Sequence, residues 1–217
     1  MTLPFSTEAF LGVFAAWNEA IWPLPVPLAL LGLAAVGLVR ARHSWSDRAI
    51  AAILALFWAI VAVGYHAAFF SALTPAAYAY AALFALEAGL LLERGVIRGR
   101  LAFGRPRGPA GVAALLAIAY GLAVYPLVAL GVTHPYPATP LFGVAPCPTV
   151  IFTIGMLLLL RPRPPAVLAA VPLVWAVIGG SAALLLGVPE DIGLPVAGLA
   201  LLAVLWQRRG GGRPSEA

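Results

Sequence analysis

A few polar side chains could carry chemistry in a chain that is otherwise apolar. His66, His134 and Cys147 are of the types that bind soft metal ions such as Cu(I) and Zn(II). We expect the three to converge on a metal ion or a small polar solute in a pocket walled by prolines. The alternative is an interfacial histidine, a hydrogen-bonded loop histidine and a small buried thiol. No CxxC or HxxxH spacing accompanies these residues, so both interpretations stay open.

Other polar residues surround this candidate site. Tyr65 precedes His66 in the sequence Tyr-His-Ala-Ala-Phe-Phe, and we expect it to contact the same ligand. Asn18 and Glu19, from the N-terminal arm, are predicted to form a polar lip. The acidic residues at 190 and 191 approach from the last loop on the same side.

Glu87 is the only acidic residue well inside an apolar segment. It follows Pro75 by 12 residues, which is about 18 Å along a helix and so near the middle of a membrane. An ionisable side chain at that depth suggests a proton or cation relay. The alternative is a neutral carboxyl group that hydrogen-bonds Tyr80 or another helix.

The elements that must position these residues follow from composition. The 217 residues are 63% hydrophobic and only 10% charged, whereas soluble domains are about 45–50% apolar and about 25% charged. We therefore predict an all-α fold, an integral membrane helical bundle in one transmembrane domain over 1–217. A short interfacial helix at about 7–20 precedes the spans, and a flexible tail over 207–217 follows them. The seven predicted spans are 21–39, 49–70, 76–93, 110–132, 144–160, 166–187 and 192–206.

The arginines predict the orientation of the spans. All 13 basic residues are arginine, and they fall in four clusters at 40–48, 94–107, 161–163 and 208–213, each after an odd-numbered span. The loops after the even-numbered spans contain none. Under the positive-inside rule, the N-terminus lies outside and the C-terminus in the cytoplasm. This placement favours contact with membrane lipids and argues against nucleic acid as a partner.

Two of the predicted spans are short. Only 12 residues separate Pro27 from Arg40, and 12 separate Pro148 from Arg161. Each makes about 18 Å of helix against a hydrocarbon core of about 30 Å. Each must therefore bring its proline-rich upstream stretch into the membrane, where non-helical backbone has to be buried in protein or line a cavity. The matching spacings also suggest a parallel 3+1+3 repeat, with spans one to three duplicated as five to seven.

Several stretches together resemble the DUF6064 family of small bacterial multi-pass membrane proteins. They are Asn-Glu-Ala-Ile-Trp-Pro at 18–23, Tyr65-His66 with Pro-Ala-Ala-Tyr at 75–78, His-Pro-Tyr-Pro at 134–137 with Pro-Cys-Pro-Thr at 146–149, and Ile-Gly-Gly-Ser-Ala-Ala at 178–183. The resemblance implies a bacterial cytoplasmic membrane location and supplies no reaction, substrate or site. The 3+1+3 layout is also similar to SWEET-type sugar carriers, although the Pro-Gln motif of their bacterial half-size relatives is absent.

Our interpretation is a permease for a small solute or ion, with a pocket open to the outer face. The first alternative is a membrane sensor or accessory subunit that binds a partner. The second is a redox or thiol enzyme using Cys147, which ranks last because no acid or base partner stands at a recognisable spacing. A non-enzyme is therefore favoured and no catalytic residue is assigned. A soft metal ion is the one cofactor that the residues suggest, and a homo-oligomer stays open.

Overall fold

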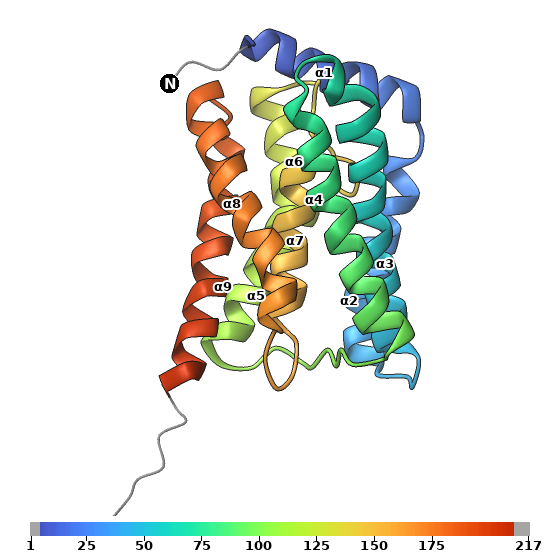
Figure 1. Cartoon of the computed structure of the whole chain (residues 1–217), viewed down its shortest axis with the longest axis vertical. Helices are drawn as coiled ribbons and strands as arrows, with labels where there is room; N and C mark the ends of the chain where they lie inside the picture. Colours follow the sequence, from blue (N-terminus) through green and yellow to red (C-terminus); the bar gives the residue numbers. More distant parts are fainter. Residues whose placement is uncertain (1–4, 211–217) are drawn as a thin grey trace, which may run out of the picture.

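The computed structural model describes residues 5–210, with side chains through residue 207. Most helices run along the long axis of the molecule, and α1 lies across one end of them (Figure 1). The helices are α1 Thr7–Ile21, α2 Pro25–Ala41, α3 Ser46–Ile60, α4 Ala76–Leu91, α5 Gly108–Ala119, α6 Tyr125–Val128, α7 Pro146–Leu158, α8 Ala166–Leu186 and α9 Gly193–Gly210. Short π-helices are Val61–Phe69, Leu92–Ile97, Tyr120–Val124 and Ala129–Thr133, and 3-10 turns are Phe70–Ala72 and Pro189–Ile192.

The predicted helical bundle is confirmed. Five continuous helical units are long and apolar enough to cross a membrane, and they correspond to the second, third, fourth, sixth and seventh predicted spans. Residues 5–210 contain no β-strand. The count of seven spans and the internal repeat stay predictions. The five units are Ser46–Ala72, Ala76–Ile97, Gly108–Thr133, Ala166–Leu186 and Pro189–Gln207.

The other two segments are the short ones. The helices α1 and α2 could form a sixth span together, but they are bent by 90° at the break between them. The helix α7 has only 13 residues. Every residue of α7 except Cys147 is buried, and α5, α8 and α9 all pack against it. A helix surrounded by other helices does not have to match the thickness of the hydrocarbon core, which explains how α7 can be short.

Glycines let α7 approach its neighbour closely. A Cβ atom at Gly121 would lie 2.6 Å from the carbonyl oxygen of Pro148, and one at Gly155 would lie 2.9 Å from that of Ala114. These contacts are with backbone atoms, which cannot move aside easily. Small residues at such crossings are how apolar helices associate where water provides no driving force.

The bundle divides into two groups of helices. Figure 1 shows α2, α3 and α4 together on one side and α5, α7, α8 and α9 on the other. Packing within each group is more extensive than the α3–α7 and α4–α8 packing that joins them. Residues 98–107 are the covalent connection between the groups, at the end opposite α1 (Figure 1).

Loops with arginine gather at the end opposite α1, in agreement with their alternation in sequence (Figure 1). This end is held by hydrogen bonds: Phe103 N donates to Asp47 Oδ1 at 2.9 Å, and Arg161 Nη2 donates to the carbonyl oxygen of Arg105 at 3.1 Å. The helix α9 continues to Gly210, so the predicted tail is helical at its start. The rest of that tail, with Arg213, lies outside the described residues.

Candidate solute-binding cavity

A cavity of about 220 Å³ lies beneath α1, at the end of the bundle without arginine. Both groups of helices contribute to its wall: the π-helix Val61–Phe69 and α4 from one, and α7 and α8 from the other. The turn 188–191 closes it beside α8. Aromatic rings dominate the lining, namely those of Phe5, Phe10, Phe14, Tyr65, Phe70, Tyr80, Tyr125 and Trp175.

His66 projects into this aromatic lining. Its ring centroid is 4.8 Å from that of Phe84, 5.2 Å from that of Trp175 and 5.8 Å from that of Tyr80. The side chain is fully buried among rings from α4 and α8. Within residues 5–210, neither ring nitrogen of His66 nor the hydroxyl of Tyr65 has a hydrogen-bond partner. Both residues belong to a π-helix, a distortion that is frequent at functional sites.

The helix α1 is fixed over the cavity at several points. Ser6 caps its N-terminus by accepting from Ala9 N at 3.1 Å, and the Thr7 hydroxyl donates to the carbonyl oxygen of Leu186 on α8 at 3.2 Å. Further along, Trp17 Nε1 donates to the carbonyl oxygen of Val144 at 3.1 Å. The Trp17 ring lies against Gly64, where any Cβ atom would collide with it. The cover therefore spans both groups of helices.

A buried carboxyl group lies at the wall formed by the turn 188–191. Asp191 is 5% exposed, and its Oδ1 accepts a hydrogen bond from the Tyr125 hydroxyl at 2.6 Å. The Cys147 thiol, at the start of α7, interacts with the same carboxyl group. Trp175 Nε1 and the Cys147 sulfur both lie close to Gly179 on α8. A Cβ atom at Gly179 would be 3.1 Å from the nitrogen and 3.5 Å from the sulfur. Tyr125, Cys147 and Asp191 all line the cavity.

A second polar network holds the neighbouring loops. Glu190 Oε1 accepts from the Thr133 hydroxyl at 3.0 Å and lies 3.5 Å from His134 Nε2. The Tyr120 hydroxyl donates to the backbone oxygen of Glu190 at 2.7 Å. Asn18 Nδ2 donates to two carbonyl oxygens in the loop before α7, those of residues 137 and 139, each at 2.7 Å. None of these five side chains, from Asn18, Tyr120, Thr133, His134 and Glu190, lines the cavity.

The predicted site residues thus fall into separate places. Tyr65, His66 and Cys147 share the cavity, whereas His134 belongs to the second network. Asn18 is buried and holds a loop. Glu19 is exposed. Among residues 5–210 no three His, Cys, Asp or Glu side chains are placed to hold a metal ion, so the predicted set of His66, His134 and Cys147 is not assembled.

Glu87 is fully buried on α4. Within the described part of the chain, neither of its carboxyl oxygens has a hydrogen-bond partner, so the alternative bond to Tyr80 is not formed. It follows Phe84, which contacts His66, by three residues and so lies about one helical turn beyond that ring.

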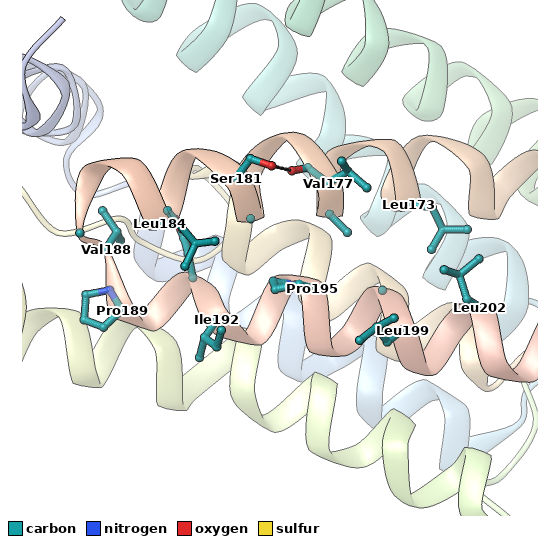
Figure 2. Close-up of a pocket in the computed structure, with 16 residues that line it drawn as sticks. Leu173, Val177, Ser181, Leu184, Val188, Pro189, Ile192, Pro195, Leu199 and Leu202 are labelled. Carbon is teal, nitrogen blue, oxygen red and sulfur yellow. Dashed lines mark hydrogen bonds between the residues drawn. The ribbon is translucent and has the colours of Figure 1, made fainter. Parts of the chain in front are cut away.

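A groove between α8 and α9 adjoins the cavity. It has a volume of about 690 Å³ and an apolar lining that includes Leu184, Pro195 and Leu199 (Figure 2). Its one hydroxyl in view, that of Ser181, donates to the carbonyl oxygen of Val177 at 2.7 Å (Figure 2). Three residues line both hollows: Ala183, Val188 and Asp191.

Comparison with known proteins gives the family of the chain. A model described as a family of unknown function, DUF6064, matches residues 7–213. The chain belongs to the DUF6064 family. No curated protein and no solved structure matches this DUF6064 protein. The family has no assigned activity.

Sequence reasoning missed the residues that complete the cavity. Tyr125 and Trp175 lie in apolar segments where an aromatic residue is ordinarily a packing residue. Asp191 was placed on the correct side of the molecule but given no role. A tyrosine and an acidic residue 66 positions apart share no local pattern that could have identified them.

Proposed function

We propose that this DUF6064 protein is a membrane permease for a small solute and that the cavity beneath α1 is its binding site. The observation that carries the proposal is the aromatic cavity lined by Tyr65 and His66, whose side-chain polar atoms are buried and have no partner among the described residues. Ligand sites are typically apolar hollows with a few polar groups that orient the ligand. A buried polar atom without a partner costs about 1–3 kcal/mol, which a bound solute with matching groups would recover.

The position of the cavity supports transport rather than simple binding. Its walls come from both groups of helices, which are joined to each other by limited packing. A site between two bodies can be exposed to one side of a membrane and then the other by a rocking motion. Glu87 is buried beyond Phe84 and has no hydrogen-bond partner among the described residues, and it would serve as the proton or cation relay of such a cycle.

Cys147 provides a test that needs no known solute. It is the only cysteine and it lines the cavity. The protein is reconstituted in liposomes, and MTSET, a thiol reagent that does not cross membranes, is either added outside or trapped inside. A permease should allow modification of Cys147 from both sides. Modification from one side only would contradict the permease and favour the sensor, and none from either side would contradict a cavity open to solutes.

A matched pair of variants shows whether the reagent passes through the cavity. Ala182 lines the cavity, and Ala170 is exposed on the same helix about three turns away. We expect Ala182→Leu to slow modification from both sides because the larger side chain fills the space. Ala170→Leu should leave both rates within about twofold of wild type, since exposed substitutions have small effects. Equal rates for the two variants would place the route elsewhere.

A further inference from the structure

We propose that the solute is a small organic cation, an amine whose ammonium group binds Asp191 and whose apolar body lies against the aromatic wall. This inference rests on the proposed function, because it assumes that the cavity binds a solute. It assigns a role to the carboxyl group that the sequence left without one.

The charges around the cavity favour a cation. Asp191 is the one acidic side chain of the lining, and no arginine lines the cavity. Among the residues that the structure describes, Asp191 forms no ion pair, whereas its neighbour Glu190 lies opposite His134. His66 is the only basic side chain of the lining, and it also forms no ion pair there. A buried carboxylate is costly without a cationic partner, and an ammonium group would supply one.

The aromatic wall suits the rest of such a molecule. Tyr65 stacks on Phe14 with centroids 4.8 Å apart, and Tyr80 lies edge-on to Trp175 at 5.4 Å. Faces of tryptophan, tyrosine and phenylalanine attract cations within about 6 Å, and the same rings pack well against an apolar body. Neutral hydrophilic solutes such as sugars would gain less from this lining, because it offers few hydrogen-bonding groups.

The size and surroundings of the cavity further define the class of solute. A protein cavity of about 150 Å³ can hold benzene, so 220 Å³ has room for one aromatic ring with a short amine chain. Asp191 also lines the apolar groove between α8 and α9. A molecule bound at Asp191 could therefore place its apolar part along that groove.

Protection of Cys147 measures binding with defined probes. Purified protein in detergent is treated with N-ethylmaleimide in the presence of 2-phenylethylamine, a cation at pH 7, or 2-phenylethanol, a neutral molecule of the same shape. We expect the amine to protect at a concentration about 10- to 100-fold lower, the range of a charge-assisted hydrogen bond. Equal protection by the two probes would overturn the cation while leaving the cavity as a solute site. If neither probe protects Cys147 and MTSET does not reach it, the proposed function also fails.

Two adjacent acidic residues make a matched pair. Asp191→Asn keeps the size of the side chain and removes its charge, so it should abolish the preference for the amine without changing protection by the alcohol. Glu190→Gln makes the same change in a residue that faces His134 and does not line the cavity, so this variant should keep the preference for the amine. An unchanged preference in Asp191→Asn would refute the assignment. Protection by phenylethanol in each variant shows that the cavity has folded.

Discussion

Replacing Tyr125 by phenylalanine isolates the hydrogen bond that holds Asp191. The hydroxyl lies 2.6 Å from Asp191 Oδ1, and the side chain is 1% exposed. Phenylalanine keeps the ring and its contact with Tyr120. Hydrogen bonds within membrane bundles are worth about 0.6 kcal/mol on average and at most about 1.7 kcal/mol. Because the acceptor is a buried carboxyl group, we expect Tyr125→Phe to lower the free energy of unfolding by about 1.5 kcal/mol, near the upper value.

The same substitution at two other tyrosines provides values for comparison with Tyr125→Phe. The Tyr120 hydroxyl is partly buried and donates to a backbone oxygen, so Tyr120→Phe should cost about 0.6 kcal/mol. Tyr78 is 62% exposed and makes no side-chain hydrogen bond within the described residues, so Tyr78→Phe should be neutral within about 0.5 kcal/mol. The free energy of unfolding is measured for all three in mixed micelles, with tryptophan fluorescence followed as sodium dodecyl sulfate is increased.

The order of the three values carries the test. If Tyr125→Phe is as stable as wild type, the bond does not hold Asp191, and the cavity wall must be fixed by packing alone. If all three variants lose the same free energy, the loss reflects the tyrosine hydroxyl in general and burial has no influence.

Two more pairs of substitutions test what supports the cavity. Gly121→Ala should destabilise the protein by about 1–3 kcal/mol in the same unfolding assay, because its Cβ atom would meet backbone atoms of α7, whereas Gly131→Ala, with nothing within 4 Å, should be neutral or stabilising. Asn18→Ala should cost about 1–3 kcal/mol by leaving two loop carbonyl groups without a donor, whereas the exposed Glu19→Ala should change stability by less than about 0.5 kcal/mol. Equal effects within either pair would contradict the corresponding contact.

Much of the fold could be predicted because membrane helices leave a strong signal in composition. Long apolar runs located the five long helical units, and the alternation of arginine clusters located the two ends of the bundle. The shortness of the fifth segment was also apparent. Its cause was not, because a helix that is apolar on every face gives no sign of whether it faces lipid or protein. Only packing reveals that α7 lies at the centre.

The candidate site was predictable only in part for a related reason. Tyr65 and His66 are neighbours in the sequence, so finding one located the other. The pairs Tyr125–Asp191 and His134–Glu190 join residues more than 50 positions apart, and the route of the chain between them decides which polar groups meet. The sequence predicted that His134 and Cys147 lie together. In the structure they belong to different networks, because His134 lies near Glu190 whereas Cys147 interacts with Asp191.

The location of the cavity follows from irregular backbone at one end of the bundle. Regular apolar helices pack side chain against side chain and leave little space. At the α1 end, the π-helix Val61–Phe69 forms part of one wall, and most of the non-helical stretch 139–145 before α7 is buried. The left-handed residue Gly187, with φ 68°, ends α8 and lets the chain turn back so that Asp191 faces inward. These departures from regular helix leave space and polar atoms at the same place, which is what a site for a small solute requires.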